Sequence, residues 1–170
     1  MRRLRILSGL LVLTAASTFA FASGASAQTH WVATLVGANE SPAVASPAIG
    51  QFDATLSQAQ DNLTFTLTYS GLVGTMTQAH IHRGGPAVNG PIIYWLANGD
   101  VASPIIACSD PTPLGGGCGF SSSDFTDLQA GNLYVNLHSS FAPGGEIRGQ
   151  ITSATPVGPQ TWARMKAMYR

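Results

Sequence analysis

Two histidines one residue apart are the residues of this sequence whose types and spacing point most clearly to chemistry. His80 and His82 stand in AHIHRGGPAVNGPIIYWL, and His138 follows much later in LYVNLHS. Side chains alternate between the two faces of a strand, so His80 and His82 point to one face. Neutral imidazole is a ligand for zinc and for copper. The pattern predicts a metal site of His80, His82 and His138, with Glu146 as a further ligand.

A hydrogen-bonded network is the alternative interpretation of the same histidines. In this alternative no metal binds, and an ion pair between Glu146 and Arg148 helps to tie the strands together. The polar residues that would join the histidines in the network alternate with apolar ones along two later segments: Tyr134, Asn136, Glu146, Arg148 and Gln150.

Short strands must position these side chains. NLTFTLTYSGL (62–72) alternates apolar residues with threonine, which is typical of a half-buried antiparallel strand. The expected strands are 30–37, 50–57, 62–72, 78–82, 91–96, 132–139 and 146–152. With turn signals between them and no long helical period, they predict an all-β, antiparallel Greek-key β-sandwich. One short helix is expected over 122–131, with Phe125 and Leu128 packed on the sandwich.

Two turns in this pattern have specific roles. Pro143, Gly144 and Gly145 form a tight connection that would make the strands on either side an antiparallel hairpin. Asn89 and Gly90 suit a turn with positive φ just before a strand. Both turns would bring polar residues of neighbouring strands together.

The two ends of the chain differ from its middle. Residues 1–27 combine three arginines, an apolar stretch and an Ala-x-Ala site, which predicts a signal peptide cleaved after Ala27 and a secreted or periplasmic protein. Residues 28–152 then form the domain. Residues 153–170 are a linker and a short basic tail, which either contacts an anionic membrane or a partner through 160–170 or is a frayed end.

Charge and cysteine content narrow the functional classes. From residue 28 to 153, two arginines stand against eight acidic residues, a net charge of −6, which excludes nucleic-acid binding. A protein or a glycan is therefore the expected class of partner. Cys108 and Cys118 flank a Gly/Pro-rich loop, and in an exported chain this pair predicts a disulfide that contributes about 2–3 kcal/mol.

The sequence also predicts that the protein is not an enzyme. It contains no G-x-S-x-G elbow, no H-E-x-x-H and no phosphate-binding glycine loop. Asp100, Asp110, Asp124 and Asp127 lack the spacing of a calcium loop, so solvated loop acids are expected there. A superoxide dismutase-like or hydrolytic site would need an open coordination position in a cleft.

Taken in order, the motifs H-I-H, N-G-P, L-Y-V-N-x-H and G-G-E-I-R-G-Q resemble those of the CHRD domain, a module of chordin that is widespread in exported microbial proteins. The resemblance runs from about residue 31 to 152. It implies an immunoglobulin-like β-sandwich in an exported protein. The signature residues that it marks are His80, His82, Asn89, Gly90, Tyr134, Asn136, His138, Gly144, Gly145, Glu146, Arg148 and Gln150.

Two functions follow from this reading. The first is a non-catalytic binding or structural module of the cell envelope or extracellular space, without a metal. The alternative is a β-sandwich that binds copper or zinc through the H-x-H strand and a third histidine. Saturated hydrogen bonding of the polar rows would favour the first, and convergence of the three imidazoles would favour the second.

Overall fold

Each strand expected from alternation is present in the computed structural model, which describes residues 30–106 and 119–154. The last expected strand is interrupted at Ile151 and becomes two short ones. The strands are β1 (His30–Val36), β2 (Ile49–Leu56), β3 (Leu63–Ser70), β4 (Met76–Arg83), β5 (Ile92–Asn98), β6 (Leu133–Ser139), β7 (Ile147–Gln150) and β8 (Thr152–Ser153). The helices are η1, a 3₁₀ turn (Gly37–Asn39), and α1 (Ser122–Gln129).

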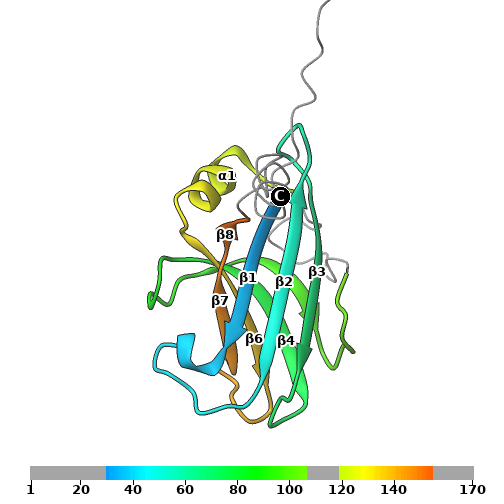
Figure 1. The fold of residues 1–170 in the computed structure, drawn as a ribbon, viewed down its shortest axis with the longest axis vertical. Helices are drawn as coiled ribbons and strands as arrows, with labels where there is room; N and C mark the ends of the chain where they lie inside the picture. Colours follow the sequence, from blue (N-terminus) through cyan, green and yellow to red (C-terminus); the bar gives the residue numbers. More distant parts are fainter. Residues whose placement is uncertain (1–29, 107–118, 155–170) are drawn as a thin grey trace, which may run out of the picture.

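These strands form one antiparallel sheet that curls upon itself. The order is β3-β2-β1-β7-β6-β4-β5, and β8 pairs with β1. The pair of Val36 with Arg148 links β1 to β7, and together with the pairing of β8 to β1 it joins the two halves of the sheet. In Figure 1, β1, β2 and β3 lie in front of β4 and β6. The all-β class is confirmed, but the Greek-key immunoglobulin-like arrangement is not, because this link makes one continuous sheet.

The hydrophobic core lies between the two halves of the curled sheet. Leu35, Phe52 and Leu67 are completely buried on one half, and Leu137 and Ile147 are completely buried on the other. Phe52 also stacks on the Phe65 ring, with 5.6 Å between ring centroids. Alternation places these side chains on the inner face and the threonines of β3 on the outer face.

The outer faces of the two halves differ. On β3 the polar residues are exposed, as expected for a half-buried strand. On β6 all seven residues are buried, including the polar ones. A strand that is buried on both faces needs partners for its outer polar groups. The buried polar groups on the outer face of β6 and the residues that contact them form the candidate site.

The single helix, α1, is confirmed and caps one end of the sheet. Ser121 and Asp124 form a capping box, and Leu128 is buried. Asp124 is not a solvated loop acid as expected: it is buried, accepts a hydrogen bond from Tyr94 (2.5 Å) and pairs with Arg83 (2.6 Å). Asp127 lies in α1 as well and pairs with Arg83 Nε at 2.7 Å.

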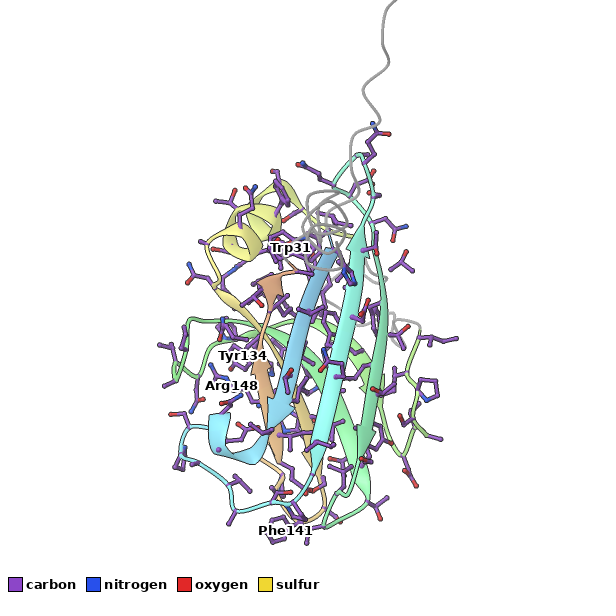
Figure 2. All side chains as sticks on the ribbon, viewed as in Figure 1. Trp31, Tyr134, Phe141 and Arg148 are labelled. Atoms are coloured by element: carbon purple, nitrogen blue, oxygen red, sulfur yellow. The ribbon has the colours of Figure 1, made fainter. Side chains whose placement is uncertain are left out.

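The two ends of the described domain lie side by side. β8 pairs with β1 through Trp31 with Ser153 and Val32 with Thr152. The amide of Ala154 then donates to the carbonyl of His30 at 2.8 Å. Figure 2 places Trp31 at this end, next to α1, and Phe141 at the opposite end.

Several expectations fall outside the described residues: the signal peptide over 1–27, the disulfide between Cys108 and Cys118, and the tail beyond Ala154. Within the described ranges, no helix has the length and hydrophobicity needed to cross a bilayer.

Leu35→Ala tests the position of the core. Leu35 is completely buried, so the truncation should lower the free energy of unfolding by about 2–5 kcal/mol. Ile49→Ala on the neighbouring strand removes a side chain that is 59% exposed and should cost less than about 0.5 kcal/mol. Urea denaturation measures both values. Equal losses in the two variants would contradict a core between the sheet halves.

Candidate metal centre

The pairing of β4 with β6 brings the three histidines together. His80 lies opposite Asn136, His82 opposite Tyr134, and Gln78 opposite His138. Directly opposed residues of an antiparallel pair point to the same face, with Cβ atoms about 5 Å apart. The outer polar rows of the two strands therefore form one cluster, as the sequence predicted for His80, His82 and His138.

The histidine nitrogens converge. Nδ1 of His80 lies 3.1 Å from Nε2 of His138. One nitrogen from each of the three imidazoles lies within 4.8 Å of the other two. Two metal–nitrogen bonds of about 2 Å span roughly 4 Å at most, so small rotations of the rings would allow all three to bind one ion.

Backbone carbonyls fix the orientation of two imidazoles. Nδ1 of His82 donates to the carbonyl of Gly90 at 2.9 Å, and Nδ1 of His138 donates to the carbonyl of Pro143 at 2.9 Å. In a neutral ring, a proton on Nδ1 leaves a lone pair on Nε2. Metal-binding histidines commonly donate their second nitrogen in this way, which sets the tautomer and the ring orientation.

Internal hydrogen bonds do not saturate the cluster. Nε2 of His80 and Nε2 of His82 are buried and have no hydrogen-bond partner in the described structure, and the same holds for Oδ1 of Asn136. His80 is only 1% exposed. A buried polar atom without a partner costs about 1–3 kcal/mol. The complete network expected for a metal-free module is therefore not found.

Burial keeps the three imidazoles neutral. Desolvation lowers the pKa of His80 to about 3, with additional repulsion from His138 and His82. Burial also lowers the pKa of His82 and of His138, although the hydrogen bonds to Gly90 and Pro143 act in the opposite direction. A histidine must be neutral to bind a metal. All three are therefore in the ligand form at neutral pH.

Aromatic rings flank the histidines. The Trp95 ring of β5 meets His80 edge-on, with 4.2 Å between centroids. Tyr134 stacks on His82 at 4.9 Å, nearly parallel to it. The guanidinium of Arg148 lies 3.4 Å above the centre of the Tyr134 ring. Tyr134 and Arg148 are neighbours on the same side of the molecule in Figure 2.

Arg148 attaches the loop between β4 and β5 to this face. Its Nη2 donates to the carbonyls of Gly85 and Val88, and its Nη1 donates to Oδ1 of Asn89 at 3.1 Å. Gln150 adds three hydrogen bonds from Nε2 to the carbonyls of Gly84, Gly131 and Leu133. The expected ion pair of Arg148 with Glu146 is not formed.

The structure places Glu146 away from the histidines. Its carboxylate accepts from Ser46 Oγ (2.6 Å), from the Val73 amide (2.8 Å) and from Ser139 Oγ. Burial would raise the pKa of Glu146, but these hydrogen bonds and one from Gly74 lower it, so it is ionised. The interpretation as a ligand fails because Glu146 lies in the turn before β7, where strand alternation does not yet apply.

The tight turn between β6 and β7 is confirmed, and it has a specific demand at Gly145. Here φ is +127°, and a Cβ would lie 2.6 Å from the Asn136 amide and 2.7 Å from Oε1 of Glu40. Gly144, the preceding residue, has open space around it. Of the two glycines in the turn, Gly145 is the one at which neighbouring side chains leave no room for a Cβ atom.

Glu40 and Trp95 are site residues that the sequence analysis missed. Oε1 of Glu40 is buried without a hydrogen-bond partner in the described structure. Glu40 also lines a cavity of about 300 Å³ together with Pro86, Arg148 and Gln150. Burial raises the pKa of Glu40 to about 7, although Arg148 acts in the opposite direction. For Trp95 the sequence PIIYWL gave no signal, because it has no alternation of polar and apolar residues; the register of β4 with β5 places Trp95 opposite His80.

Comparison with known proteins gives one match. A family model described as the CHRD domain matches residues 31–151, a range that holds His80, His82, His138, Tyr134 and Arg148. Among curated proteins and solved structures, none matches the chain.

Gly145→Ala should destabilise the domain, because the added methyl group meets Asn136 and Glu40 in a backbone conformation that alanine disfavours. We expect a loss of about 1–3 kcal/mol in the free energy of unfolding. Gly144→Ala in the same turn is the matched control and should change stability by less than about 0.5 kcal/mol. Similar values for both variants would rule out the steric argument.

Glu40→Gln tests the buried carboxyl. A pKa raised from 4.5 to about 7 means that the folded state holds a proton that the unfolded chain releases, so this contribution to stability is present below pH 4.5 and is lost as the pH rises to about 7. Glu40→Gln should remove this part of the pH dependence. It should also stabilise the domain above pH 7 by up to about 3 kcal/mol. Denaturation across this pH range measures the effect, and parallel curves for both proteins would refute it.

Proposed function

The chain belongs to the CHRD domain family, and from this membership we propose that it is an exported, non-catalytic module that binds one copper or zinc ion through His80, His82 and His138. The family supports a binding or structural role. The convergence of the three histidines supports a metal ion as the ligand, which the module would bind for storage, sensing or capture.

One observation carries this proposal: His82 and His138 each donate Nδ1–H to a backbone carbonyl, which leaves the lone pair on Nε2, and one nitrogen of each of the three imidazoles lies close to the other two. In a saturated structural network both nitrogens of every ring would have a partner, whereas Nε2 of His80 and Nε2 of His82 have none in the described structure. Here the carbonyls at Gly90 and Pro143 hold the rings in the tautomer and direction that a metal requires. Nε2 of His82 gains a partner when an ion binds.

Burial supports a binding role over a catalytic one. His80, His82 and His138 are all buried, and the rings of Trp95 and Tyr134 lie against two of them. Catalytic metal sites keep a coordination position open to substrate. A histidine site enclosed in this way suits an ion that is held.

Export is supported by the sequence of residues 1–27, with its basic start, apolar stretch and Ala-x-Ala site. The secreted or periplasmic chain would begin at Gln28 and carry the disulfide between Cys108 and Cys118. The excess of acidic residues over 28–153 supports a protein or glycan partner over nucleic acid. The basic segment 160–170 is where contact with a membrane would occur.

His82→Ala and His138→Ala test the function. Each removes a ligand with a fixed orientation, so metal measured by mass spectrometry should fall from one ion per chain to a small fraction of that. Losing an outer hydrogen bond to a ligand already costs about 10–100-fold in affinity, and losing the ligand itself should cost more.

His30→Ala is the matched control, since His30 pairs with Asp53 on an exposed part of β1 and should leave the metal content unchanged. Circular dichroism establishes that each variant is folded. A wild-type protein that takes up neither copper nor zinc, with all variants folded, would rule out the metal-binding function.

A further inference from the structure

The histidine cluster favours an ion of low charge. We propose that it binds copper as the monovalent cuprous ion and discriminates against divalent zinc. This inference rests on the proposed function, because it names the ion that the same site takes. Three features carry it: a neutral ligand set, a nearby buried cation and histidine nitrogens that are closed to solvent.

The ligand set has no negative charge. The group of potential ligands in the described structure contains three histidines and no carboxylate or thiolate. Glu146 is held by Ser46, Ser139 and Val73. The cost of placing an ion in a medium of low dielectric constant rises with the square of its charge, so a divalent ion costs about four times as much as a monovalent one. Neutral imidazoles carry no negative charge, so they do not offset this extra cost of burying a divalent ion.

A buried cation adds to this bias. Arg148 is 2% exposed, and its guanidinium lies 3.4 Å above the centre of the Tyr134 ring. That ring stacks on His82, with 4.9 Å between centroids. Repulsion between the guanidinium and an ion at the histidines is proportional to the charge of the ion. It is therefore twice as large for zinc as for cuprous copper.

The number of ligands at the site also favours cuprous copper over zinc. Zinc takes four ligands, and where a protein supplies three histidines the fourth is water or hydroxide. Nε2 of His80 and of His82 are closed to solvent, and Trp95 and Tyr134 cover their rings. Cuprous copper, by contrast, is stable with only two or three nitrogen ligands. The enclosed triad satisfies this ion and leaves zinc one ligand short.

Asn136 offers a way to test the charge argument. It lies directly opposite His80 on β6, is buried, and its Oδ1 has no hydrogen-bond partner in the described structure. Asn136→Asp changes the charge beside the histidines with little change of shape. A negative charge attracts a divalent ion twice as strongly as a monovalent one. The substitution should therefore favour zinc.

The experiment is a competition on the purified chain under anaerobic conditions. A coloured chelator of cuprous copper reports how much copper the protein retains, first alone and then with a large molar excess of zinc. We expect one cuprous ion per chain, retained against zinc. Binding should also quench tryptophan fluorescence, and Trp95→Phe should remove most of this change because Trp95 contacts His80.

At alkaline pH, Asn136→Asp should lower the ratio of the affinity for cuprous copper to the affinity for zinc by about tenfold or more. Gln51→Glu adds the same charge to an exposed position of β2, on the other half of the sheet, and should leave the preference roughly unchanged. An equal effect of both substitutions would overturn the charge argument.

The outcomes separate this inference from the function beneath it. Copper retained against zinc, with the preference narrowed in Asn136→Asp, supports the inference. Stoichiometric zinc that displaces copper overturns the cuprous assignment and leaves a metal-binding module. A chain that binds neither ion overturns both.

Discussion

The register between β4 and β6 is the constraint on which the rest of the structure depends. It places Ala79 and Ile81 in the core with Val135 and Leu137, and it places the histidines on the opposite face. A shift of one residue would drive imidazoles into the apolar interior and expose aliphatic side chains. The large penalty for that shift fixes the pairing. The same penalty brings His80 and His138 into contact, so core packing and site geometry follow from one alignment.

Arg148 shows how a cation is buried on the outer face of the described structure without a carboxylate at ion-pair distance. Carbonyls of Gly85 and Val88, the Asn89 side chain and the Tyr134 ring surround its guanidinium. These dipoles and the π face replace the water that the cation loses on burial. The loop between β4 and β5 is thereby fixed over the strands. Because this loop supplies the Gly90 carbonyl to His82, the cation also helps to orient a histidine.

Local pattern was sufficient for much of this architecture. The alternation in Leu63–Ser70 and the spacing of His80 and His82 each predict a face, and both predictions are confirmed. Alternation does not predict the direction of Glu146, because this residue lies in the turn before β7 and its carboxylate is held by Ser46, Val73 and Ser139. Glu40 lies far from Asn136 in the sequence, and its burial depends on how a loop folds over the sheet. The continuity of the sheet depends on the pairing of β1 with β7 and β8, through Val36 with Arg148 and through Trp31 and Val32, which no periodicity could indicate.

The proximity of the two ends has a mechanical consequence. His30 and Ala154 are joined by a hydrogen bond, so the chain enters and leaves the domain at one point. If both ends were pulled, as in a tethered protein at a surface, the force would act first on the short ladder between β1 and β8, opening its bonds one after another. The histidines on β4 and β6 lie outside this path. Tension would therefore peel back the short end strand and leave the buried cluster intact until the sheet itself gave way.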